Sequence, residues 1–375
     1  STLQWWLEKC QSPLSGRAFI IAALILRRAY NQHTISEIIR DSSYSPDVLS
    51  DREQKLVSSL TNNDIVHSDM PVHVRLNYPQ WLEKKLQDAF GDKLEAAMLS
   101  MNLQAPTDLR VNNLKITREK LLKLLRAEGF DCDKTPLSPL GIRLARRVPI
   151  FTSSSFKDGH FEVQDEGSQI VGLLVDAATN HRVIDFCAGA GGKTLTIAAG
   201  MENKGRILAW DTSEKRLGQI HKRLKRAGVH NVQTHVLESE HDAFIKRHKS
   251  TADRVLVDVP CSGSGTWRRN PDLKWRQSPL SVAELQEKQL RILTAAAKLL
   301  KPGGRLVYAT CSVLREENED VVNAFLAAQP QFEIEALGPL LQRLDLALPD
   351  TTMLHLDPVR SGTDGFFATV LKRLS

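Results

Sequence analysis

The segment HRVIDFCAGAGGKT (181–194) joins a short apolar run to a glycine-rich turn. The apolar run is typical of a buried strand, and the turn leads into an expected helix. In a doubly wound α/β sheet, a glycine-rich turn between a strand and a helix is where the cofactor binds. The segment therefore predicts this fold class and places a ligand site at the turn.

Outward from this turn, apolar strands alternate with amphipathic helices. The helices are expected at 213–228 and 281–300. Continuous apolar strands that alternate with helices indicate a parallel sheet covered on both faces. We therefore expect a Rossmann-like, doubly wound domain over residues 161–375. Its predicted strands are HRVIDFCA (181–188), GRILAWD (205–211), VQTHVL (232–237), DRVLVDVP (253–260) and GRLVYATC (304–311).

The sequence before residue 161 has a different pattern. Residues 1–70 are predicted to be a helical segment, with serine or threonine caps before several of its helices. Residues 71–160 mix helices and strands, which predicts a small α+β module. The chain is thus expected to have three parts. In the module, the helices are expected at 81–90 and 117–130, and the strands at 107–112 and 141–147.

Composition limits the class of protein. The 375 residues are 42% hydrophobic and 25% charged, as in ordinary soluble domains. Five cysteines without a CxxC spacing predict free thiols in a reducing compartment and argue against a zinc site. The longest apolar stretch, AFIIAALIL (18–26), is too short to span a bilayer, and no signal peptide is visible. We expect a cytoplasmic monomer with no metal and no membrane contact.

Three kinds of nucleotide compete for the glycine-rich turn. A phosphate-binding Walker loop needs glycine where Cys187 stands, and a dinucleotide loop needs glycine where Thr194 stands. S-adenosylmethionine carries no phosphate, so its loop only has to let the backbone approach and offer N–H groups to a carboxylate. The turn meets this looser requirement, and we expect it to bind S-adenosylmethionine.

Acidic residues end the three strands that follow the turn. Asp211 ends the first of them, where a carboxylate can accept both hydroxyls of a ribose. Glu238 ends the next strand and could reach the adenine, and Asp258 ends the one after it, facing the same site. Each acid alone is equally compatible with a helix cap or a solvated group. Three in succession favour a nucleoside site.

Two cysteines, Cys261 and Cys311, follow strands at the sheet edge where ligands bind. A single buried cysteine is usually a small apolar side chain. A thiolate beside a methyl donor, however, suits methylation of pyrimidine carbon 5, because its addition to carbon 6 makes carbon 5 nucleophilic. Asp258 is placed to hold the ring nitrogen and the amine of cytosine. This chemistry leaves open which cysteine attacks.

Several motifs occur in a characteristic order. They are DFCAGAGGKT (185–194), Asp211, DVPCSGSGTWRRNPDLKW (258–275), KPGGRLVYATCSVLREENE (301–319) and SGTDGFF (361–367). In this order they resemble the Sun (Fmu) family of RNA cytosine carbon-5 methyltransferases, over about residues 161–375. The helical start is similar to the bacterial branch that methylates 16S ribosomal RNA. There the resemblance implies a NusB-like domain in shortened or divergent form.

The resemblance implies a role for each site residue. Cys311 would be the nucleophile and Cys261 would assist release. The sequence departs from the family at Ala190, where proline is usual, and at Glu238, where aspartate is usual. The residues implied to bind S-adenosylmethionine are Cys187, Ala188, Gly189, Ala190, Gly191, Gly192, Lys193, Asp211, Glu238 and Asp258.

Basic and aromatic residues follow the Pro-Cys turn. Arg268, Arg269 and Lys274 are expected to bind RNA phosphates. Trp267 and Trp275 could stack on bases or pack within their own loop. The net charge of +6 permits a polyanionic partner without requiring one.

Two further basic surfaces are less specific. The helix at 213–228 carries six lysines and arginines, and such a face is more often only solvated. The α+β module is expected to extend the RNA surface. Its candidate residues are Arg75, Arg110, Arg146 and Arg147.

The expected substrate is an unpaired cytosine in a loop or bulge of RNA, because a stacked base hides its reactive carbon. Ribosomal RNA is the first candidate and transfer RNA the second. Two other functions remain open: a methyltransferase for an amine or small molecule, and a non-catalytic RNA-binding scaffold. DVPC (258–261) offers a thiol where nucleic-acid amino methylation typically uses a turn with two prolines. Binding alone has no use for two cysteines.

Overall fold

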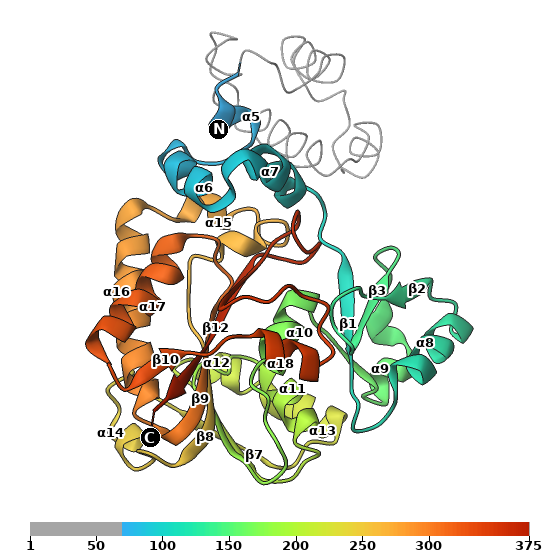
Figure 1. Cartoon of the computed structure of the whole chain (residues 1–375). Coiled ribbons are helices and arrows are strands. Elements are labelled where there is room, and N and C mark those ends of the chain that lie inside the picture. The colour runs from blue at the N-terminus through green and yellow to red at the C-terminus, as the bar shows by residue number, and fades with distance from the viewer. Residues whose placement is uncertain (1–69, 375) are drawn as a thin grey trace. The chain divides into compact units, whose positions relative to one another are not determined.

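The computed structural model describes residues 70–374, which divide into two compact units (Figure 1). The described part of the first unit comprises residues 70–105 and Trp267–Ser278. The second comprises Pro106–Thr266 and the chain from Pro279 onward. The predicted helical segment 1–70 lies almost entirely outside the described residues. The predicted module 71–160 is shared between the two units, because residues 106–160 pack with the α/β domain.

The described part of the first unit is helical. Its core includes Leu82, Leu86, Phe90 and Met98, which are buried at the spacing of an amphipathic helix pair. The predicted helix at 81–90 is confirmed as a short 3-10 turn followed by α6. The elements are α5 (Val72–Arg75), η2 (Gln80–Leu82), α6 (Glu83–Phe90), η3 (Gly91–Lys93), α7 (Leu94–Asn102) and, from the distant segment, α15 (Leu273–Arg276).

The second unit contains a small antiparallel sheet with the order β2-β3-β1-β4. Leu109, Leu121 and Ile142 join its strands to α8 in one apolar core. Both predicted strands and the predicted helix of this region are present. The elements are β1 (Thr107–Val111), α8 (Arg118–Ala127), β2 (Cys132–Lys134), β3 (Gly141–Leu144), η4 (Ile150–Thr152), α9 (Ser154–Lys157) and β4 (Phe161–Val163).

The large sheet of the second unit contains all five predicted apolar strands. They run parallel in the order β9-β8-β5-β6-β7. This order reverses beside β5, so the loop after β5 lies at the switch point where doubly wound sheets bind ligands. The strands are β5 (Arg182–Asp185), β6 (Arg206–Asp211), β7 (Val232–Val236), β8 (Ala252–Asp258) and β9 (Leu300–Thr310).

The sheet also contains antiparallel strands, which the sequence pattern did not predict. Strand β12 (Phe366–Arg373) runs antiparallel to β9 along its outer edge. It also pairs with β10 (Phe332–Ile334) and β11 (Met353–Leu356). Strand β9 ends more than fifty residues before β12 begins, so no local pattern reveals that these two strands are antiparallel neighbours.

Helices cover both faces of the large sheet, as predicted (Figure 1). Val183 and Ile184 are consecutive in β5 and point into opposite cores. The predicted helix 213–228 is divided in two near Gly218. One face carries α10 (Glu166–Leu173), α11 (Gly192–Gly200), α12 (Glu214–Leu217), α13 (Ile220–Ala227) and α18 (Gly338–Arg343), and the other carries α14 (Ala243–Lys246), α16 (Pro279–Ala297) and α17 (Glu319–Ala328).

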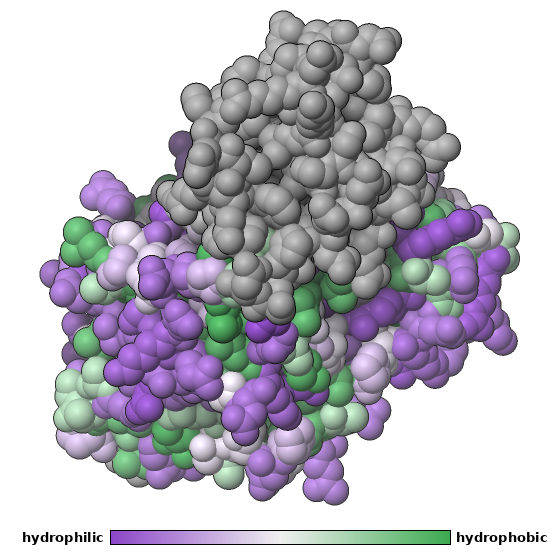
Figure 2. Space-filling model, turned by 90° about the horizontal axis from the view of Figure 1, so that it is seen from above, coloured by the Kyte–Doolittle hydropathy of each residue, from purple (hydrophilic) through white to green (hydrophobic). Residues whose placement is uncertain are grey.

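The surface of the described residues is mixed in character. On the face in Figure 2, hydrophilic side chains alternate with smaller hydrophobic patches, as is ordinary for globular proteins. Within residues 70–374, no helix has the length and apolarity needed to cross a bilayer.

Candidate active site

The loop between β5 and α11 has a backbone that only glycine tolerates at two positions. Gly189 has φ +56° and Gly191 has φ +83°, both in the left-handed region. A Cβ on Gly189 would lie 2.4 Å from Arg216 Nη2, and one on Gly191 would lie 2.3 Å from Ile220 Cγ1. The two glycines therefore fix the loop against neighbouring helices, and α11 begins directly after it.

Asp211 ties the loop to the end of β6. Its Oδ2 accepts a hydrogen bond from Gly189 N (2.8 Å), and its Oδ1 accepts one from Ser213 N (2.8 Å). A carboxylate has about four acceptor positions, so both oxygens keep capacity for further hydroxyl donors. Glu238 follows β7, the strand beside β6, but its side chain is exposed to solvent.

Asp185 is a further acid of this region, and sequence reasoning gave it no role. It ends β5, is fully buried, and accepts a hydrogen bond from Thr194 Oγ1 (2.6 Å). Burial raises the pKa of Asp185 to about 7, with the Thr194 bond acting in the opposite direction.

The two predicted thiols lie together. Strands β8 and β9 are parallel neighbours, with Asp258 opposite Ala309, so both cysteines leave the sheet at the same edge. Cys261 Sγ lies 3.2 Å from Cys311 Sγ, and both side chains are partly exposed. The hydrogen bond with Cys311 and then burial raise the pKa of Cys261 well above its usual value.

Lys193 connects the glycine loop to the thiol edge. It lies in the first turn of α11, and its Nζ is 2.7 Å from Asp258 Oδ2. Burial alone would lower the pKa of Lys193, but the pair with Asp258 outweighs it, so the pKa is raised. A negative charge on Cys311 also favours the ammonium form. Lys193 of the glycine loop therefore interacts electrostatically with both Asp258 and Cys311.

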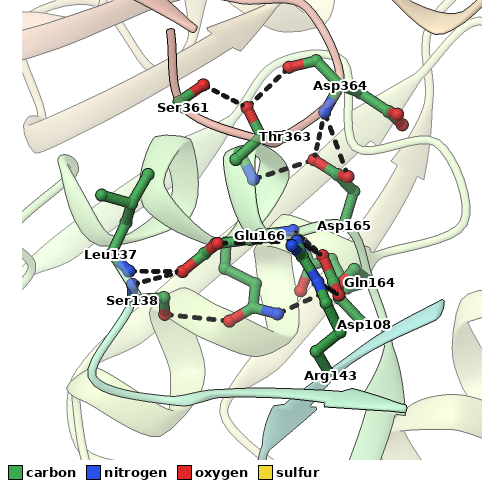
Figure 3. Close-up of polar contacts among 12 residues, drawn as sticks. Asp108, Leu137, Ser138, Arg143, Gln164, Asp165, Glu166, Ser361, Thr363 and Asp364 are labelled. Atoms are coloured by element: carbon green, nitrogen blue, oxygen red, sulfur yellow. Dashed lines mark hydrogen bonds and ion pairs between the residues drawn. The ribbon is translucent and has the colours of Figure 1, made fainter. Parts of the chain in front are cut away.

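A polar network joins the small sheet to the large domain, as Figure 3 shows. Arg143 of β3 binds Asp108 of β1 through two bonds of 2.7 and 2.9 Å. Glu166 at the start of α10 accepts bonds from the backbone N–H groups of Leu137 and Ser138, both 2.7 Å. Asp165, which caps α10, accepts a bond from Asp364 N (3.2 Å) in the loop before β12.

Two family models of known proteins match this chain. A family model described as 16S rRNA methyltransferase RsmB/F matches residues 173–372. A second one, described as an RsmF/B-like ferredoxin-like domain, matches residues 78–151. The chain belongs to the RsmB/F family. Its relationship to the Sun-type methyltransferases, expected from the motifs, is thereby confirmed.

Relatives of the RsmB/F family align with most of the chain. The probable ribosomal RNA small subunit methyltransferase B of Bacillus subtilis is 34% identical over 79% of this chain and 66% of its own length. Ribosomal RNA small subunit methyltransferase B of Klebsiella pneumoniae is 35% identical over 80% of this chain and 67% of its own length. The chain thus spans about two thirds of the length of these relatives.

Solved structures agree with the fold. A methyltransferase homologue from Pyrococcus horikoshii superposes with a TM-score of 0.70 at 29% identity, covering 80% of this chain and 97% of its own. NSun6 from the same organism has a TM-score of 0.68 at 22% identity, covering 79% and 98%. The Rossmann-like methyltransferase fold expected for the RsmB/F chain is confirmed.

The prediction that Lys274 binds RNA phosphates is wrong, because this residue does not lie at the surface. Its side chain is 1% exposed, and its Nζ donates to Asn77 O (3.1 Å) and Asn102 Oδ1 (2.6 Å) within the first unit. Trp267 is buried whereas Trp275 is 45% exposed. Arg268 and Arg269 are partly buried, and their RNA contact stays a prediction.

Arg110 is a second correction. It lies on β1, is 1% exposed, and donates from Nε to Gln164 Oε1 (2.7 Å). Burial lowers the pKa of Arg110 to about 10, with Glu162 opposing the shift. Successive side chains of a strand point to opposite faces of the sheet, and Arg110 is on a face that packs within the second unit. Arg75, Arg146 and Arg147 are not fully buried, so their contribution to an RNA surface stays a prediction.

Part of the basic helix 213–228 is structural. Arg223 and Arg226 of α13 both form ion pairs with Glu162 of β4. Arg223 Nη1 also donates to Ala190 O (2.8 Å) in the glycine loop. The basic residues of this helix were expected to form a solvated face. The sequence alone does not show that Glu162 lies opposite two of them.

Proposed function

We propose that the protein transfers a methyl group from S-adenosylmethionine to carbon 5 of a cytosine in structured RNA. The observation that carries this proposal is the 3.2 Å separation of Cys261 and Cys311 Sγ beside the loop of residues 187–193. A scaffold that only binds RNA needs no such pair. A methyltransferase for an amine needs no nucleophile of its own.

The glycine loop and Asp211 suit the methyl donor. The left-handed glycines let the backbone approach a ligand closely, and Asp211 has acceptor capacity left for ribose hydroxyls. The structure of NSun6 from Pyrococcus horikoshii was determined with SFG. When bound, S-adenosylmethionine supplies an electrophilic methyl group. Glu238 is proposed to contact the adenine from the solvent-exposed side of the site.

Cys311 is proposed as the nucleophile. Its thiolate adds to carbon 6 of the cytosine, forming a C–S bond and moving electron density to carbon 5, which then takes the methyl group. The ammonium of Lys193 favours the negative charge on Cys311, which supports this assignment. Asp258, which forms an ion pair with Lys193, is proposed to accept a hydrogen bond from the cytosine amine.

Cys261 is proposed to aid release. After methyl transfer, the proton on carbon 5 passes to water and the C–S bond breaks, which returns negative charge to Cys311 Sγ. Because the pKa of Cys261 is raised, this residue stays a thiol and can donate its S–H to the departing sulfur. Elimination is thereby easier, and loss of Cys261 is expected to trap the adduct.

Ribosomal RNA is the proposed substrate, and 16S RNA the first form of it to test. The support is membership of a family described as 16S rRNA methyltransferases and the names of the two relatives. Transfer RNA is the alternative substrate of the same chemistry. The cytoplasm is the proposed location, because ribosomal RNA is made and assembled into ribosomes in that compartment.

The test uses methyl-tritiated donor with 16S ribosomal RNA and, separately, transfer RNA from cells that lack the protein. We expect label in the ribosomal sample, with the modified cytosine then located by bisulfite sequencing. Cys311→Ala should abolish transfer, and Cys261→Ala should give a covalent RNA adduct visible on a denaturing gel. Label in neither RNA, or transfer by Cys311→Ala at the normal rate, would overturn the proposal.

A further inference from the structure

Each of the two site cysteines is followed by a serine, and both serines bind the same buried carboxylate. Ser262 N donates to Glu317 Oε1 (2.8 Å), and Ser262 Oγ donates to Glu317 Oε2 (2.5 Å). Ser312 Oγ donates to the same Oε2. One side chain therefore anchors the turn after β8 and the turn after β9.

Other contacts fix this carboxylate. Glu317 lies in η6 (Arg315–Glu317) and is fully buried. Gln289 of α16 donates from Nε2 to Glu317 Oε1 and to Pro260 O, both at 3.0 Å. The hydrogen bonds that the described residues give to its two oxygens all come from neutral donors. The arrangement satisfies a buried carboxylate by hydrogen bonds and leaves its negative charge uncompensated by a cation in that set.

Charges of opposite sign thus flank the two sulfur atoms. The hydrogen bond with Cys311, burial and the charge of Cys311 raise the pKa of Cys261, and Glu317 raises it further. On the other side, Lys193 interacts favourably with a negative charge on Cys311. The two cysteines therefore lie in different electrostatic environments although their Sγ atoms are 3.2 Å apart.

We infer that Glu317 is a positioning residue that gives the two cysteines their separate roles. It holds both turns in register through Ser262 and Ser312, and its charge keeps Cys261 in the thiol form while Cys311 attacks. This inference rests on the proposed function for the roles themselves. The unequal reactivity of the two thiols is independent of it.

The experiment measures alkylation of the folded full-length protein by iodoacetamide, with each cysteine followed by mass spectrometry between pH 7 and 9. In the unmodified protein we expect Cys311 to react faster than Cys261. Glu317→Gln keeps the side chain's shape and removes its charge. It should raise the rate at Cys261 relative to Cys311 about threefold or more at pH 8. Glu333→Gln, on an exposed position of β10, is the matched control and should leave the ratio unchanged.

A second variant separates charge from anchoring. Ser262→Ala keeps the Glu317 charge, so it should leave the alkylation ratio near that of the unmodified protein while slowing methyl transfer to RNA. Glu317→Gln should in addition increase the share of enzyme caught as the covalent RNA adduct.

Two results would overturn the inference. One is an unchanged alkylation ratio in folded Glu317→Gln. If that variant does not fold, the unmodified protein still decides, because equal alkylation of Cys261 and Cys311 across this pH range contradicts unlike thiols. Alkylation needs neither RNA nor methyl donor. A failed methylation assay would therefore reject the proposed function and leave the alkylation result to be judged separately.

Discussion

Lys193 Nζ lies 2.7 Å from Asp258 Oδ2, which joins the first turn of α11 to the end of β8. The same ammonium lies 5.4 Å from the ring centre of Phe366 at the start of β12. The side chains of Lys193 and Asp258 are both largely buried, so water screens their ion pair less than it screens one at the surface. The glycine loop and the end of β8, which precedes Cys261, therefore share one cation.

Lys193→Met is expected to slow methyl transfer to RNA by about tenfold or more, because it leaves the partly buried Asp258 carboxylate without its cation. The measurement is the rate of transfer from methyl-tritiated S-adenosylmethionine to RNA. Lys204→Met, on an exposed lysine, is the control, and equal rates in both variants would contradict the role of the ammonium.

Gly191→Ala is expected to weaken binding of S-adenosylmethionine by at least about tenfold. The methyl group would meet Ile220 at a position with φ +83°, where strain costs about 1–3 kcal/mol. Isothermal titration calorimetry measures the effect. Gly200→Ala, at the end of α11, is the matched control, because the nearest atom to its Cβ is 3.8 Å away. Tight binding by both variants would show that the loop conformation does not govern the site.

Arg223→Met tests whether the small sheet supports the donor loop. It removes the bond from Nη1 to Ala190 O (2.8 Å) and the ion pair with Glu162. Loss of such a charged hydrogen bond typically costs about 1.5–3 kcal/mol. We expect an increase of about tenfold in the dissociation constant for S-adenosylmethionine, measured without RNA. Lys222→Met, on the exposed side of α13, should bind normally.

Lys274→Met tests the buried amine of the first unit through pH. Burial lowers the pKa of Lys274 from 10.5 to about 7. Between these values the unfolded chain binds a proton that the folded chain does not, so this group makes stability rise with pH, by up to ~1.4 kcal/mol per unit. The variant lacks that rise. The melting temperature of the variant minus that of the unmodified protein should therefore be highest near pH 7 and fall towards pH 10. Parallel curves for the two proteins would contradict the lowered pKa.

Local sequence patterns predicted the central features well. An apolar run that stops at a polar residue marks where a parallel strand leaves the sheet, so the runs before Cys261 and Cys311 located both thiols at one edge. The glycine-rich turn was also located correctly between a strand and a helix. A Cβ on Gly189 or Gly191 would meet a neighbouring side chain, so the structure accounts for glycine at both positions.

The features missed by sequence all depend on distant partners. Arg110 and Lys274 were expected at the surface because charged residues usually are, yet each is buried beside polar groups far away in the chain. Glu317 had no role because the serines that bind it belong to two separate motifs. Nothing local identifies such a partner.

The pairing of β12 with β9 has a consequence for synthesis of the protein. Cys311 directly follows strand β9, yet the outer neighbour of β9 is encoded more than fifty residues later. While the chain grows, that edge of β9 has no partner until residues 366–373 have left the ribosome. An unpaired apolar edge invites pairing with other chains. Products that stop short of Phe366 should therefore aggregate rather than accumulate as a partly active enzyme.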